Sequence, residues 1–195
     1  ITPSGQVAEG YEMTSISSNP TTIFLKGNKA ILNSISSIQI PSDVISIEGA
    51  NKDVTATVDV SEYIPEGVEL AIAEQATVEI TVSVGKVKTK SYTINTDDIV
   101  IIGLGTHHTL EYELNSVAVN ITGLETDINV LKNEMLVGSI DVTELDVGTH
   151  RVKLVLDLDE NKYVQERVMV KVKITDDSDT EVTNSEYGNN RTNNR

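Results

Sequence analysis

The sequence contains no cysteine, no tryptophan and a single phenylalanine in 195 residues. Without cysteine it has no disulfide, no thiolate nucleophile, no cysteine-ligated zinc site and no iron–sulfur cluster. The aromatic content is only 4%. This scarcity disfavours a sugar-binding platform, and it disfavours a single-stranded nucleic-acid groove, which stacks bases on aromatic rings.

Positive charge is also scarce. Lys and Arg total 15 against 30 Asp and Glu, so the formal net charge is −15. Nucleic-acid binding needs clustered Lys and Arg to neutralise phosphates, so this composition argues against a nucleic-acid partner.

Long apolar runs are missing as well. No run exceeds the length of Ile99–Ile102, far below the about 20 residues that a membrane-spanning helix needs. No signal peptide is visible, and the chain starts at Ile1 instead of Met. We therefore expect a soluble piece of a longer protein, or a processed one.

Branched aliphatic residues are plentiful, and they recur in a repeated order that indicates two copies of one unit. Each run alternates with period two, as a half-buried strand does. Most positions of the first copy reappear 95 or 96 residues later, and the last strand reappears 90 residues later. The matched positions are Ile23 with Val119, Leu25 with Ile121, Gly27 with Gly123, Leu32 with Ile128, Ile35 with Leu131, Ile45 with Ile140, Ile47 with Val142, Ala56 with Val152, Val58 with Leu154, Val60 with Leu156, and Val78–Val84 with Val168–Ile174.

Each copy also carries one segment with helical spacing. In the first, Asn28 is a candidate N-cap, followed by Ile31, Leu32, Ile35 and Ile38 on one face. In the second, Leu124, Ile128 and Leu131 share a face. Between strands of the first copy, Pro65-Glu66-Gly67 predicts a turn. The predicted fold is mainly β, with tandem small β-rich domains that each hold one short amphipathic helix.

The repeat predicts a first domain over residues 5–90 and a second over 91–175. Residues 176–195 contain little besides Asn, Asp, Ser, Thr and Glu. Such a segment buries too little apolar surface to offset its ordering entropy, so we predict a disordered, polar, acidic tail.

The search for chemistry yields no catalytic residue, metal ligand or cofactor site. Neighbouring His107 and His108 would point to opposite faces of a strand, which favours surface histidines over a shared metal. Asp157–Asn161 begins like a calcium loop, but Lys162 and Val168 stand where the EF-hand pattern needs Gly and Glu. A polar turn is the better interpretation, although a weak calcium site of another kind stays open.

Charged side chains supply candidates for docking a protein partner. Ser91–Leu131 has six carboxylates and no Lys or Arg, while the closing strands place Lys on their polar phase. Solvated faces, or lysines that guard a sheet edge, are the preferred explanation of these patterns. Docking through complementary charge is the functional alternative. The candidate docking residues are Asp97, Asp98, Glu111, Glu113, Lys86, Lys88, Lys171 and Lys173.

Several motifs resemble the YbbR-like domain family. In the first copy these are Gly10–Met13, then Asn19-Pro20 with Ile23, Leu25 and Gly27, and then Ile31, Leu32 and Ile35. The second copy adds Ile140-Asp141-Val142-Thr143 with Leu145, Gly148, His150 and Val152. The first copy departs from this last pattern, because it has Ile45-Ser46-Ile47-Glu48-Gly49 and lacks the Leu-x-x-Gly step.

The resemblance implies tandem β-rich units outside the cytoplasmic membrane, attached by an anchor absent from this sequence. It further implies a non-enzymatic, cofactor-free regulator that binds a protein partner, such as a membrane-bound diadenylate cyclase. Two alternatives stay open: a structural spacer or adhesin-like surface protein, and an envelope sensor that binds a small molecule or metal.

Overall fold

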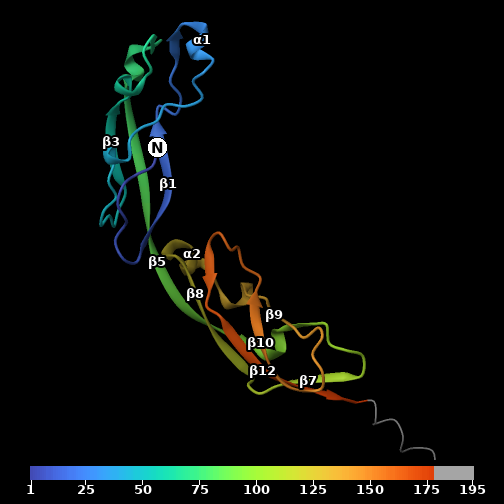
Figure 1. The fold of residues 1–195 in the computed structure, drawn as a ribbon. Helices are drawn as coiled ribbons and strands as arrows, with labels where there is room; N and C mark the ends of the chain where they lie inside the picture. Colours follow the sequence, from blue (N-terminus) through green and yellow to red (C-terminus); the bar gives the residue numbers. More distant parts are fainter. Residues whose placement is uncertain (178–195) are drawn as a thin grey trace, which may run out of the picture. The chain divides into compact units, whose positions relative to one another are not determined.

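The computed structural model describes residues 1–177 and divides into two compact units (Figure 1). The first unit is Ile1–Lys88 and the second begins at Thr89. Both are built mainly from strands, which confirms the predicted fold class. Most of the predicted tail, residues 178–195, lies outside the described residues.

The first unit combines an antiparallel sheet with a two-stranded ribbon. In the sheet, β5 lies between β1 and β3, and the ribbon pairs β2 with β4. Its elements are β1 (Tyr11–Asn19), β2 (Leu25–Gly27), α1 (Lys29–Leu32), η1 (Ser42–Val44), β3 (Val54–Asp59), η2 (Val60–Tyr63), β4 (Val68–Leu70), η3 (Ala73–Ala76) and the first part of β5 (Thr77–Asn95).

The second unit has a five-stranded sheet in the order β6-β9-β10-β12-β7, and β8 pairs with both β5 and β11. Its further elements are η4 (Thr96–Asp98), β6 (Val100–Ile102), β7 (His108–Tyr112), β8 (Ser116–Leu124), α2 (Glu125–Val130), η5 (Asn133–Met135), β9 (Gly138–Asp141), β10 (Gly148–Leu156), β11 (Tyr163–Gln165) and β12 (Val168–Asp176).

Strand pairing is the same at equivalent positions of the two units. In the first unit Val58 lies opposite Val78 and Ala56 opposite Ile80. In the second, Leu154 lies opposite Val168 and Val152 opposite Val170. Each pair keeps the offsets seen in the sequence, so the aliphatic pattern sets the same register twice.

One glycine in each unit permits the same close approach. A Cβ on Gly27 would lie 2.6 Å from the carbonyl oxygen of Gly67, and one on Gly123 would lie 2.5 Å from that of Lys162. Gly27 pairs with the first residue of β4, and Gly123 pairs with the first residue of β11. Both glycines are therefore required by contact with the backbone that enters the partner strand.

The two cores differ in size. Sixteen buried hydrophobic residues form the core of the second unit, and seven form that of the first. The first core consists of Ile45, Ile47, Val58, Val60, Val78, Ile80 and Val82, all from the repeat positions or their strands.

Some expectations about the first copy are wrong. Asn28 does cap α1, because its side chain accepts a hydrogen bond of 2.8 Å from the Ala30 amide. The helix nevertheless ends at Leu32, so Ile35 and Ile38 are not on a helical face. Four residues are too few for a stable helix of its own, and no residue of α1 is buried.

Of the two explanations for the lysines, a guard at a sheet edge does not hold for Lys171 and Lys173, because they lie on β12 between β10 and β7. The predicted turn at Pro65–Gly67 is confirmed, with the Val68 amide donating to the Pro65 carbonyl over 3.3 Å. The segment that begins like a calcium loop forms a turn too, in which Asp159 accepts from the Asn161 amide.

Candidate docking surface

The sheet of the second unit turns one face toward its core and the other toward solvent. Alternate residues of β10 and β12, such as Leu154 and Val172, are buried. Their neighbours in the sequence are exposed, which gives the outward face a polar character. We call this outward face the β7–β12 face. Its charged members are Glu111 and Glu113 of the β7 side, Arg151 and Lys153 of β10, and Lys171 and Lys173 of β12.

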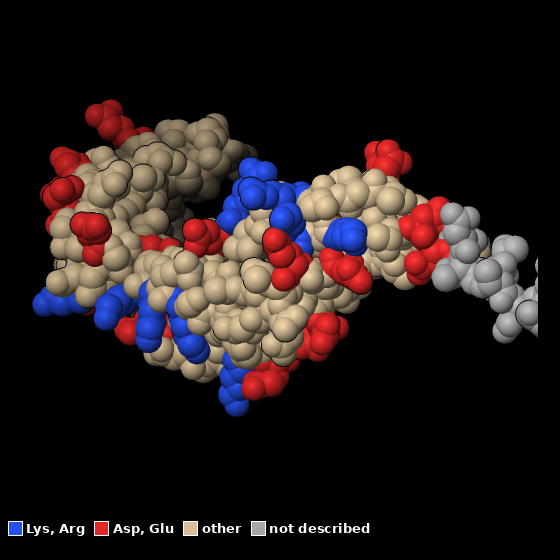
Figure 2. Space-filling view, turned by 90° about the horizontal axis from the view of Figure 1, so that it is seen from below, with Lys and Arg blue, Asp and Glu red and all other residues tan. Residues whose placement is uncertain are grey.

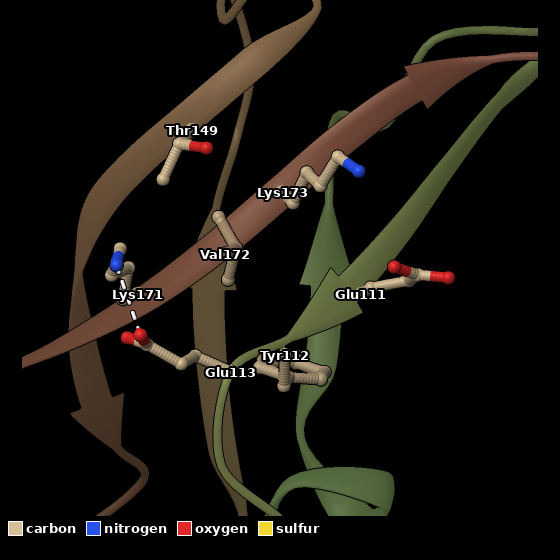
Figure 3. A pocket seen from close by; sticks show the side chains of 7 residues that line it. All are labelled: Glu111, Tyr112, Glu113, Thr149, Lys171, Val172 and Lys173. Carbon is tan, nitrogen blue, oxygen red and sulfur yellow. Dashed lines mark hydrogen bonds and ion pairs between the residues drawn. The ribbon is translucent and has the colours of Figure 1, made fainter.

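Acidic and basic side chains meet where β7 lies beside β12 (Figure 3). Lys171 Nζ lies 2.9 Å from Glu113 Oε1, and the Glu113 amide donates to the Lys171 carbonyl over 3.2 Å. Glu111 and Lys173 are direct cross-strand partners. A shallow hollow of about 230 Å³ lies here, lined by Glu111, Tyr112, Glu113, Thr149, Lys171, Val172 and Lys173.

Toward β10 the face becomes basic. Arg151 lies directly opposite Lys171, so two like charges are cross-strand neighbours. Such a pair costs stability in an isolated sheet, and an acidic partner would relieve the repulsion. On the side of the molecule seen in Figure 2, Lys and Arg side chains gather in small groups with acidic residues beside them.

Apolar side chains complete the outward face. Val155 and Met169 are exposed beside Lys153, which lies directly opposite Met169. Val100 and Ile102 of β6 are exposed as well. Val100 pairs with Ser139, which in turn pairs with Val155, so the apolar groups of β6 and β10 lie on either side of a serine of β9. Exposed apolar groups rimmed by charge are typical of protein–protein contact sites.

The structure brings together four of the eight predicted docking residues: Glu111, Glu113, Lys171 and Lys173. Lys86 and Lys88 belong to the first unit, and Asp97 and Asp98 lie in η4. Sequence reasoning missed Arg151 and Lys153. Their signal was present in the alternation of residues 148–156, where charged positions interleave with Val152 and Leu154.

Tyr112 joins the hollow to the core beneath it. Its hydroxyl oxygen is buried and has no hydrogen-bond partner within the described residues. Burial raises the pKa of Tyr112, and the nearby Asp97 carboxylate raises it further. Both effects favour the neutral phenol, because an ionised one would be desolvated and repelled.

The histidines do not converge with other ligands. Within residues 1–177 there is no group of three or more His, Asp or Glu side chains arranged to hold a metal ion. His150 Nε2 instead lies 2.7 Å from the Asp146 carbonyl oxygen. None of the described helices is both long and apolar enough to cross a membrane.

Comparison with known proteins finds a family match in the first unit. Residues 1–84 match the family model described as YbbR-like protein. This part of the chain is a YbbR-like domain. The match covers the first unit, and the assignment of the second unit to the same family remains a prediction.

A curated relative extends the similarity into both units. The CdaA regulatory protein CdaR of Bacillus subtilis (strain 168) is 27% identical over 180 residues, which cover 90% of this chain. The aligned part is 35% of that protein, so this chain spans about a third of the relative's length.

Two solved structures of YbbR-like proteins are also similar. One, from Streptococcus pneumoniae TIGR4, is 20% identical with a TM-score of 0.38, covering 47% of this chain and 48% of that one. The other, a YbbR-like domain from Listeria monocytogenes, is 18% identical with a TM-score of 0.37, covering 48% of this chain and 97% of that one.

Proposed function

We propose that this chain is a non-catalytic part of a regulator that binds a membrane-bound diadenylate cyclase and changes its activity. The proposal rests mainly on one observation, the similarity to the CdaA regulatory protein CdaR over 90% of this chain. In this proposal the chain lies outside the cytoplasmic membrane and is held there by an anchor elsewhere in the full-length protein.

The contact is assigned to the β7–β12 face of the second unit. This face combines exposed apolar groups with Arg151, Lys153, Lys171 and Lys173, in a chain whose net charge is −15. Because these four basic groups outnumber Glu111 and Glu113, the face carries a net positive charge within an acidic molecule, which favours an acidic partner surface. The partner surface expected here is apolar at its centre and acidic at its rim.

Co-purification tests the proposal at the level of the whole protein. The full-length protein that contains this chain is expressed with the diadenylate cyclase of the same organism, and the complex is isolated through a tag on the cyclase. We expect the regulator to co-purify and the cyclic-di-AMP level to change when its gene is deleted. A full-length protein that neither binds the cyclase nor changes this level would contradict the proposal.

Charge reversal tests the face itself. Combining Lys171→Glu and Lys173→Glu should weaken cyclase binding at least about tenfold, because close charge pairs at interfaces are worth one to several kcal/mol. The matched control combines Lys29→Glu with Lys52→Glu, two exposed lysines of the first unit that change the net charge equally. Titration by biolayer interferometry at two salt concentrations provides the measurement. Equal affinities for the double variant and the control would exclude this face as the contact.

A further inference from the structure

In the first unit, β2 has a paired strand on one edge only, whereas its counterpart in the second unit, β8, is paired on both edges. There, β8 has β11 on one side and β5 on the other. Residues 89–95 of β5, which we call the cover strand, belong to the second unit. By contrast, β2 pairs only with β4 among the strands of the described residues.

The cover strand closes the core of the second unit. Its Tyr92 and Ile94 side chains are only 2% and 4% exposed. The Tyr92 hydroxyl donates one hydrogen bond that is shared between the carbonyl oxygens of Ile128 and Leu131, at 3.2 and 3.3 Å. These carbonyls lie near the end of α2, where backbone acceptors lack partners within the helix. The cover strand therefore buries apolar surface and also supplies a hydrogen-bond donor to carbonyl groups at the end of α2.

Equivalent side chains of the first unit lack this cover. Val119, Ile121, Ile128, Leu131 and Leu136 are buried in the second unit. The residues at the same repeat positions are only half-buried: Ile23, Leu25, Leu32, Ile35 and Ile40. All five differences fall on the side of the unit that includes β2 and α1, while the opposite side, with Val58, Ile80 and Val82, is fully buried.

The repeat also indicates where a covering strand would join the first unit. Gly5 and Gly103 both have positive φ, of 82° and 77°. A Cβ on Gly5 would collide with Glu48, and a Cβ on Gly103 would collide with Thr143 at the equivalent position. With Gly5 equivalent to Gly103, Ile1 is equivalent to Ile99. Ile99 is 6% exposed and Ile1 is 43% exposed. The equivalent of the cover strand therefore falls directly ahead of Ile1.

We propose that the first unit is completed by a β-strand joined ahead of Ile1, which pairs with β2 as the cover strand pairs with β8. Its occupant is an extended segment that places two apolar residues, in alternation, against the half-buried side chains of β2 and α1. Only residues 96–98 separate the cover strand from Ile99, so the equivalent strand joins the first unit through an equally short connection. A second copy is a poor occupant, since its own cover strand is already buried in its second unit.

A graft tests this proposal on the whole chain. The sequence of residues 86–98 is fused directly ahead of Ile1, so that it stands before Ile1 as it stands before Ile99. The matched control is the same graft with serine at the two positions that copy Tyr92 and Ile94. Amide hydrogen exchange by NMR reports on the residues of and around β2, and sedimentation gives the mass of each protein.

We expect the graft to slow exchange at Leu25–Gly27 by about tenfold or more, relative to the serine control, with a monomeric mass. Unchanged exchange in the grafted chain, or equal slowing by the serine control, would overturn the proposal. Protection of β2 in the ungrafted chain together with a dimeric mass would also overturn it, because a second copy would then occupy the edge. This inference does not depend on the proposed function.

Discussion

The two units of this chain share their strand pairing but not the completeness of their cores. The second contains sixteen buried core residues and the first contains seven. The difference is concentrated around the helix, since Ile128 of α2 is fully buried and no residue of α1 is. Apolar side chains at equivalent positions are therefore buried to different extents, because their burial depends on whether a further strand packs against them.

The largest expected effect on stability comes from shortening one apolar side chain in the helix of each unit. Ile128→Ala should lower the free energy of unfolding of the second unit by about 2–5 kcal/mol, as for other buried isoleucines. Leu32→Ala, at the equivalent position of the first unit, should cost under about 1 kcal/mol because the side chain is already half solvated. Urea unfolding followed by NMR resonances of each unit separates the two. Equal costs would show that the two helices are equally packed.

The glycine contacts should behave alike in both units, unlike the helices. Gly27→Ala and Gly123→Ala each place a Cβ about 2.5 Å from the backbone carbonyl oxygen of the residue before the partner strand, closer than van der Waals contact allows. Each should destabilise its own unit by about 1–3 kcal/mol through backbone displacement. The control is Ser116→Ala, at the exposed start of β8, which should leave thermal and urea midpoints unchanged. If Gly27→Ala left stability unchanged, the backbone contact between β2 and the residue before β4 would be less tight than the one between β8 and β11.

Tyr92 and Tyr112 of the second unit differ in the hydrogen-bond partners of their hydroxyl groups. Tyr92→Phe removes a hydrogen bond shared between two backbone carbonyls and should cost about 1 kcal/mol. Tyr112→Phe removes a buried hydroxyl that has no partner among residues 1–177, so stability should stay the same or rise. Chemical denaturation of both variants at neutral pH provides the comparison. A loss at Tyr112 as large as that at Tyr92 would reveal an unrecognised partner for its hydroxyl.

The smallest expected effect is a pH dependence from Tyr112. Its pKa is raised in the folded state, so the unfolded chain loses the phenolic proton first as the pH rises. The stability contribution of the neutral phenol is therefore complete below about pH 10 and is lost as the pH rises through the folded pKa. Comparison of unfolding midpoints of the wild type and Tyr112→Phe between pH 8 and 11 measures it. A gap between the two curves that does not change with pH would contradict the raised pKa.

Sequence alone predicted the strands, the repeat offsets and the two turns, because period-two alternation and glycine positions are local signals. It could not predict that α1 stops at Leu32, since Ile35 and Ile38 have helical spacing and only the surrounding structure decides. It placed Glu111, Glu113, Lys171 and Lys173 among the docking candidates but did not predict their pairing across β7 and β12. That pairing depends on a strand order in which residues about 60 apart become neighbours.

Native-state hydrogen exchange of the unmodified chain tests most directly whether the second unit is complete and the first is open at β2. We expect amides of β8 to exchange more slowly than those of β2 by about a hundredfold or more, since the former open only when the core does. Similar protection of β2 and β8 in a monomeric chain would show that the first unit is already closed, and would contradict the difference inferred between the two units.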